Sequence, residues 1–223
     1  MLGRKSQRVT WLGIALVAVL ALSACGDSTA PIDTAPLFAK GGNGKPTRDA
    51  TTVAAADEDV TTATTGETGS PQMLQFAEWA PPLQTYDTTF VTYQGWRENF
   101  VIYFEDWVQF MVLEVPNSAQ FVDENGQPLP DGARVEITVH VDSNQIFLEF
   151  GPHGSSFTGN RPVMLWVWYK YSDMADNPEQ LRVWYQPNSD EKWNSLPTEI
   201  SKSGGWLKAP LYHFSNYAVA WCF

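Results

Sequence analysis

The sequence predicts an all-β protein whose folded part is a single β-sandwich, with most strand pairs antiparallel. About eight to eleven short segments rich in β-branched and aromatic residues follow one another along the chain, separated by Gly, Pro, Asn and Asp turn signals. None of these segments has the 3.6-residue apolar period of an amphipathic helix. Aromatic residues make up 13% of the chain and charged residues only 17%, which is typical of a compact aromatic-rich domain.

The segment 163–171 is the predicted centre of the sandwich. Its residues alternate between two faces, and both faces are mostly apolar up to Lys170. A strand with two apolar faces is central in a sheet, or it covers its second face with a loop or a partner. Residues 146–150 predict the preceding strand. The Gly-Pro-rich stretch 151–154 predicts a sharp corner between the two strands, with Phe157 packing the corner onto the core.

The other predicted strands flank this pair. The clean alternation of apolar and polar residues over 134–141 is typical of a half-buried strand. Further strands are expected at 88–94, 99–104, 107–115, 181–186, 192–196, 198–201, 206–208 and 212–223. Residues 73–82 predict either a first strand or irregular cover, because a double proline ends them. Turn chemistry at 105–106 and at 204–205 predicts hairpins.

The first 24 residues have the order of a bacterial lipoprotein signal peptide. Three basic residues precede an apolar run over 11–22, which is too short for a comfortable membrane span. Leu-Ser-Ala-Cys at 22–25 resembles a lipobox, which predicts cleavage before Cys25, acylation of this residue (palmitate) and attachment to the bacterial cell envelope. An ordinary signal peptide and an uncleaved anchor are the alternatives. Gly26 favours the outer membrane if the host is Gram-negative.

Residues 25–72 are predicted to be a disordered tether. They are rich in Thr, Ala, Gly and Asp and contain few large apolar residues, so they cannot bury enough surface to offset the entropy of ordering. As a random coil the tether would reach roughly 35–40 Å. The predicted organisation is therefore a signal peptide at 1–24, a tether at 25–72 and a β-sandwich at 73–223.

Charge and cysteine content disfavour several functions. The net charge is −11, and removal of a signal peptide with three basic and no acidic residues changes it to −11 − 3 = −14. Such an acidic protein is not expected to bind nucleic acid. Only Cys222 accompanies Cys25, so a lipidated chain would have no internal disulfide and no cysteine-based zinc site. His140, Asp142 and His153 would form a metal site only if their strands aligned, and we expect no metal or other cofactor.

Three motifs occur in a fixed order in the predicted domain. They are Val-Pro-Asn-Ser-Ala at 115–119, Gly-Pro-His-Gly at 151–154 with Phe157 and Pro-Val-Met-Leu at 162–165, and His213-Phe214-Ser215 with Tyr217. This order is similar to that of the ZU-five domain, a β-sandwich shared by ankyrins, netrin receptors of the uncoordinated-five type and the death-domain protein PIDD. The resemblance covers roughly residues 100–221 and implies the sandwich fold. Ser118 stands where the family has glycine.

The closing motif is similar to that of the self-cleaving ZU-five domains. The resemblance implies that Ser215 Oγ attacks the carbonyl carbon of Phe214, with His213 as the base. The peptide bond would shift to an ester that water hydrolyses, which frees the C-terminal peptide SNYAVAWCF. The alternative is an ordinary closing strand in which His213 and Ser215 are structural.

The tryptophans supply the other candidate site. Nine of the ten tryptophans follow the predicted signal peptide, and most of these nine are expected in the core. Trp166 and Trp168 share one face of their strand and form a candidate platform for a sugar ring or a protein partner. The sequence has no Ser-His-Asp order and no nucleophile elbow. We therefore predict a non-enzymatic interaction or structural module with an unknown protein or glycan partner, and keep self-cleavage and carbohydrate binding as alternatives.

Overall fold

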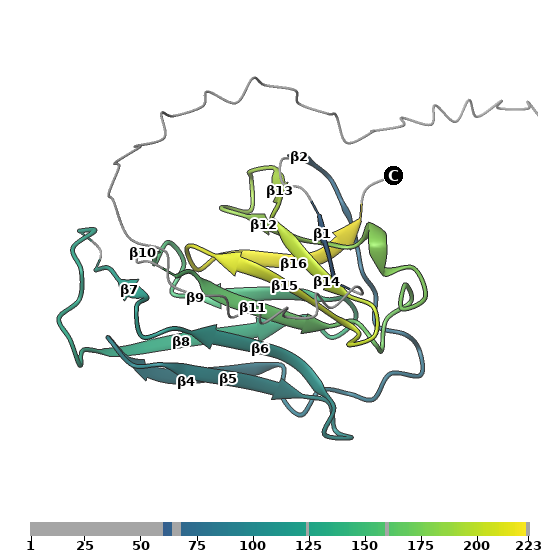
Figure 1. Cartoon of the computed structure of the whole chain (residues 1–223), viewed down its shortest axis with the longest axis horizontal. Coiled ribbons are helices and arrows are strands. Elements are labelled where there is room, and N and C mark those ends of the chain that lie inside the picture. The colour runs from purple at the N-terminus through teal and green to yellow at the C-terminus, as the bar shows by residue number, and fades with distance from the viewer. Residues whose placement is uncertain (1–59, 64–67, 124, 159–160, 222–223) are drawn as a thin grey trace, which may run out of the picture.

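The computed structural model describes residues 60–63, 68–123, 125–158 and 161–221, and these form an all-β sandwich (Figure 1). The predicted fold class is confirmed. The signal peptide, Cys25 and most of the predicted tether lie outside the described residues. Within the described part, no helix is long and apolar enough to cross a membrane.

The first sheet contains six strands in the order β1-β14-β15-β11-β6-β5, and all of its neighbours are antiparallel. The strands are β1 (Val60–Ala63), β5 (Glu98–Tyr103), β6 (Gln109–Val115), β11 (Val163–Trp168), β14 (Thr198–Ser201) and β15 (Trp206–Leu211). β11 lies between β15 and β6, so the prediction of a central strand with two apolar faces is confirmed. The predicted hairpins β5–β6 and β14–β15 are also present.

The second sheet has the order β2-β13-β12-β16-β9-β8-β4, and β3 pairs with β16 as well. The strands are β2 (Thr68–Gly69), β3 (Gln72–Met73), β4 (Asp87–Tyr93), β8 (Arg134–Val141), β9 (Phe147–Gly151), β12 (Arg182–Gln186), β13 (Trp193–Ser195) and β16 (Asn216–Trp221). β7 (Gln120–Phe121) and β10 (Phe157–Thr158) form a separate pair. A single turn of 3-10 helix, η1, spans Pro178–Gln180.

One hydrophobic core joins the inward faces of the two sheets. Leu113 and Leu165 contribute from the first sheet, and Ile137 and Val219 from the second. β8 has the same bounds as predicted and alternates strictly between exposed and buried residues, because a strand directs successive side chains to opposite faces. The sandwich therefore buries the inward face of each sheet, and β16 is buried on both of its faces from Tyr217 to Trp221.

The paired region begins before the predicted boundary at Met73. β1 and β2 lie within the segment that composition assigned to the tether, yet β1 pairs with β14 and β2 pairs with β13. These Thr-rich strands gain backbone hydrogen bonds at sheet edges, whereas composition reflects only the apolar surface that a segment can bury. The boundary of the domain is corrected accordingly.

Several strands are shorter than predicted, and turns explain the differences. The strand expected at 107–115 begins at Gln109 because Trp107 has a φ of 65° and belongs to the hairpin turn. The closing strand begins at Asn216 rather than at residue 212. Residues 73–82 contribute mainly irregular cover, with single bridges from Gln75 and Phe76 after β3.

The corner after β9 brings together residues that are distant in sequence. Phe157 is 5% exposed, and its ring contacts Phe121 at 5.8 Å and Phe214 at 5.1 Å between centroids. The predicted role of Phe157 in packing the corner onto the core is confirmed. The Gly151-Pro152 peptide bond is cis, and Thr138 Oγ1 occupies the space where a side chain on Gly151 would begin.

Candidate functional site

The outward face of the first sheet carries a cluster of half-buried tryptophans. Trp166 and Trp168 point outward from β11, and their ring centroids lie 6.4 Å apart with 21° between the ring planes. Trp206 lies opposite Trp168 on β15, and its ring is 4.8 Å from that of Trp166. The structure thus places the predicted pair side by side and adds a third ring that sequence reasoning did not single out.

A lysine lies over this cluster. Lys208 is opposite Trp166 in the β11–β15 register, and its Nζ is 4.7 Å from the centroid of the Trp166 ring. The negative face of an indole attracts a cation at this distance. The same ammonium forms an ion pair with Glu199 at 3.4 Å. One side of the aromatic cluster therefore carries a positive charge.

Two adjoining hollows lie along this face. The first, of about 240 Å³, is lined by Arg97, Asn99, Val112, Glu114, Trp166 and Trp168. The second, of about 280 Å³, is lined by Arg97, Glu114, Pro116, Asn117, Arg161, Pro162, Met164 and Lys208. Both include the ion pair between Arg97 and Glu114, whose atoms are 3.0 Å apart. We call the combined surface the β11 trough.

The β11 trough follows β11 for most of its length. Strand geometry gives roughly 20 Å from Pro162 to Trp168, which is long enough for a short oligosaccharide or an extended peptide. Its lining combines aromatic rings with charged and amide side chains, as in sites that bind an amphipathic ligand. The trough can hold a ligand, and its lining contains no arrangement of nucleophile and base.

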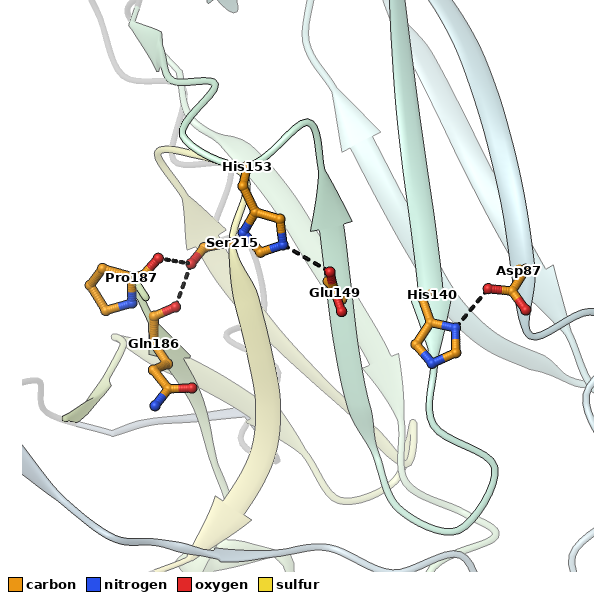
Figure 2. A network of polar contacts seen from close by, with 7 residues as sticks. All are labelled: Asp87, His140, Glu149, His153, Gln186, Pro187 and Ser215. Carbon is orange, nitrogen blue, oxygen red and sulfur yellow. Dashed lines mark hydrogen bonds and ion pairs between the residues drawn. The ribbon is translucent and has the colours of Figure 1, made fainter. Parts of the chain in front are cut away.

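In the closing motif, the Ser215 hydroxyl and the His213 ring have separate partners. Ser215 Oγ donates a hydrogen bond to the Gln186 carbonyl and lies 3.1 Å from the Pro187 carbonyl (Figure 2). The His213 ring instead packs beside Tyr185 and Tyr217, with centroids 5.3 Å and 6.3 Å away. No hydrogen bond among the described residues joins this ring to the Ser215 hydroxyl.

The two peptide units on either side of the Phe214 Cα are held by backbone hydrogen bonds to the corner after β9. Phe214 N–H donates to Ser155 O at 2.7 Å, and Phe214 O accepts from Gly154 N–H at 3.2 Å. Among the described residues, the left-handed backbone of a non-glycine residue occurs at Trp107 and not in the closing motif. Burial lowers the pKa of His213, while a backbone hydrogen bond with Phe214 acts in the opposite direction. These features favour a structural role for the motif.

We expect the purified chain to remain intact during prolonged incubation at neutral pH. The Ser215 hydroxyl donates its hydrogen bond to the Gln186 carbonyl, and the His213 ring packs beside Tyr185 and Tyr217. Mass spectrometry under denaturing conditions checks this, with Ser215→Ala as the matched control. Loss of the mass of SNYAVAWCF in the wild type but not in the variant would contradict it. The variant should lower the free energy of unfolding by about 1 kcal/mol, because it removes one hydrogen bond.

His140 on β8 and His153 in the corner after β9 each have their own carboxylate. His140 Nδ1 lies 2.7 Å from Asp87 Oδ1, and His153 Nε2 lies 2.9 Å from Glu149 Oε1 (Figure 2). Asp142 instead accepts hydrogen bonds from backbone N–H groups in the following turn. His140, Asp142 and His153 are therefore not assembled around one point, and the described residues contain no group of three or more potential metal ligands.

Two of the motifs that resemble the ZU-five domain are in direct contact. The corner after β9 pairs with the closing motif through the bridge between Ser156 and His213 and the hydrogen bonds of Phe214. Comparison of the chain with family models, with curated proteins and with solved structures found no match. The resemblance therefore rests on the sequence motifs alone.

Proposed function

We propose that the β-sandwich is a non-enzymatic binding module that holds a saccharide in the β11 trough. We also propose that a lipid on Cys25 attaches it to the bacterial cell envelope, in the outer membrane if the host is Gram-negative. The observation that carries the binding proposal is the cluster of three indole rings on an outward sheet face. The order of the three sequence motifs supports the further proposal that the domain is ZU-five-like.

A saccharide suits this surface for chemical reasons. One face of a pyranose ring presents C–H groups, which pack on the negative face of an indole, while the hydroxyls at its edge need hydrogen-bond partners. Trp166 and Trp168 supply the aromatic surface. Asn99 and the charged residues of the trough supply donors and acceptors next to the rings. The C–H face and the hydroxyl groups of a sugar ring therefore both have partners on this face of the sheet.

The binding test uses the full chain in detergent and a panel of immobilised polysaccharides, namely cellulose, chitin, polygalacturonate and peptidoglycan. The wild type should be retained on at least one of them. The double variant Trp166→Ala/Trp168→Ala should bind that polymer about ten-fold more weakly or worse, since two stacking surfaces are lost. Trp107→Ala is the matched control, because Trp107 is 74% exposed on a hairpin turn outside the trough.

Thermal unfolding of each variant shows whether the domain still folds. Retention of a folded double variant equal to that of the wild type would contradict the proposed site. Absence of wild-type retention on the whole panel would contradict saccharide binding.

The anchor is tested separately. Cys25→Ser should move the protein from the membrane fraction to the soluble fraction or block its processing, because the thiol that would be lipidated is gone. Cell fractionation and the mass of the N-terminal peptide measure the two effects. Cys222→Ser is the matched control and should leave both unchanged. A Cys25→Ser protein that is processed normally and stays on the membrane would contradict the lipoprotein proposal.

A further inference from the structure

Three basic side chains border the β11 trough, although the protein as a whole is acidic. The chain has 25 acidic and 14 basic residues. Arg97, Arg161 and Lys208 nevertheless line one 280 Å³ hollow of the trough, where Glu114 is the acidic residue. Adding Glu199, the partner of Lys208, leaves three positive charges against two negative ones. The trough therefore has a positive balance within a negatively charged domain.

The partners of these cations leave them available to a ligand. Arg97 and Lys208 form single ion pairs with Glu114 and Glu199, and all four side chains retain contact with solvent. Solvent-accessible ion pairs of this kind contribute little to stability, so exchanging one carboxylate for another costs little. Arg161 is exposed and takes part in none of the ion pairs formed among the described residues.

The basic side chains also lie next to the tryptophan rings, where they could contact the substituents of a bound sugar. In the strand register, Lys208 is opposite Trp166, and Glu114 is opposite Met164, two residues along β11. The Lys208 ammonium is already 4.7 Å from the Trp166 ring centroid. A sugar ring held by the indoles would thus place its substituents beside Lys208 and near the Arg97–Glu114 pair. Arginine binds carboxylate and sulfate groups through two parallel N–H donors.

We propose that the β11 trough selects an anionic saccharide, with its rings against Trp166 and Trp168 and its acidic groups held by Arg97, Arg161 and Lys208. This inference rests on the proposed function of the trough and adds the charge of the ligand. Binding of an anionic saccharide would be informative because the protein has a net charge of −11, and the rest of its surface therefore repels polyanions. Retention of an acidic polymer must therefore come from a local site.

The experiment compares polymers that differ in charge but share a backbone. The full chain in detergent is titrated with polygalacturonate and its methyl ester, and with dextran sulfate and dextran. We expect about ten-fold or tighter binding of the acidic member of at least one pair, as a single charge-assisted contact would give. The first pair tests for a carboxylate sugar and the second for a sulfate ester. Polyglutamate tests whether a polyanion without sugar rings suffices.

The variant Arg97→Gln/Arg161→Gln should lose about ten-fold in affinity for the preferred acidic polymer and keep its affinity for the uncharged partner. Arg134→Gln is the matched control, since Arg134 is an exposed arginine of β8 in an ion pair with Glu136. Thermal unfolding confirms that each variant is folded.

Each alternative outcome has a distinct meaning. Equal binding of acidic and uncharged polymers that still depends on Trp166 and Trp168 would overturn this inference and leave the proposed function intact. Equal binding of polyglutamate would overturn the requirement for a sugar. Absence of binding to all four polysaccharides would overturn the inference. If the wider panel also failed, the proposed function would fall with it.

Discussion

The variant Phe214→Ala should lower the free energy of unfolding by about 3–5 kcal/mol. Phe214 is 1% exposed, and its ring contacts Phe121, Phe150 and Phe157. These rings come from separate segments, so the surrounding backbone cannot collapse easily into the cavity that alanine would leave. Native domains are stable by about 5–15 kcal/mol, so this change would remove a large part of the total.

Urea unfolding followed by tryptophan fluorescence measures the effect. Tyr212→Ala is the matched control, because Tyr212 is 56% exposed and lies two residues before Phe214. It should change stability by no more than about 0.5 kcal/mol. Equal losses in the two variants would show that the contact between the corner and the closing motif does not depend on the Phe214 ring.

The variant Gly151→Ala should destabilise the domain by about 1–3 kcal/mol through overpacking. A Cβ on Gly151 would overlap Thr138 Oγ1, which lies directly opposite on β8. Thr138 is exposed and short, so relief requires the threonine to rotate or the two strands to separate. The loss should appear as a lower urea midpoint with an unchanged slope.

Thr138→Ala separates this contact from other effects at Gly151. The Thr138 Cβ is 3.8 Å from the added Cβ, an ordinary contact distance, so the double variant Gly151→Ala/Thr138→Ala should regain most of the lost stability. A double-mutant cycle measures the coupling between the two positions. Strictly additive losses would mean that the cost at Gly151 comes from its backbone and not from Thr138.

Elements with a regular apolar pattern could be predicted closely from the sequence. The alternation in Arg134–Val141 gave β8 its full bounds, and the two apolar faces of 163–168 placed β11 at the centre of its sheet. β1 and β2 carry no such pattern. They are held by backbone hydrogen bonds to strands more than 100 residues away. Local sequence contains no information about those partners.

In the candidate sites, too, local patterns could be predicted from the sequence and long-range contacts could not. A period of two residues is enough to place Trp166 and Trp168 on one face. The positions of Trp206 and Lys208 depend on the register between β11 and β15, which the sequence of one strand does not specify. The hydrogen bond of Ser215 reaches Gln186, 29 residues earlier, and only the folded structure shows that this carbonyl accepts it.

The first strands of the domain pair with its last strands, and this has a consequence for the order of folding. β1, β2 and β3 join β14, β13 and β16, so the contacts that close both sheets span most of the domain. Such long-range topologies fold slowly, on a scale of milliseconds to seconds. β16 also lies between β12 and β9. A chain that ended before Asn216 would leave β12 and β9 without their shared partner, and such unpaired strand edges favour aggregation.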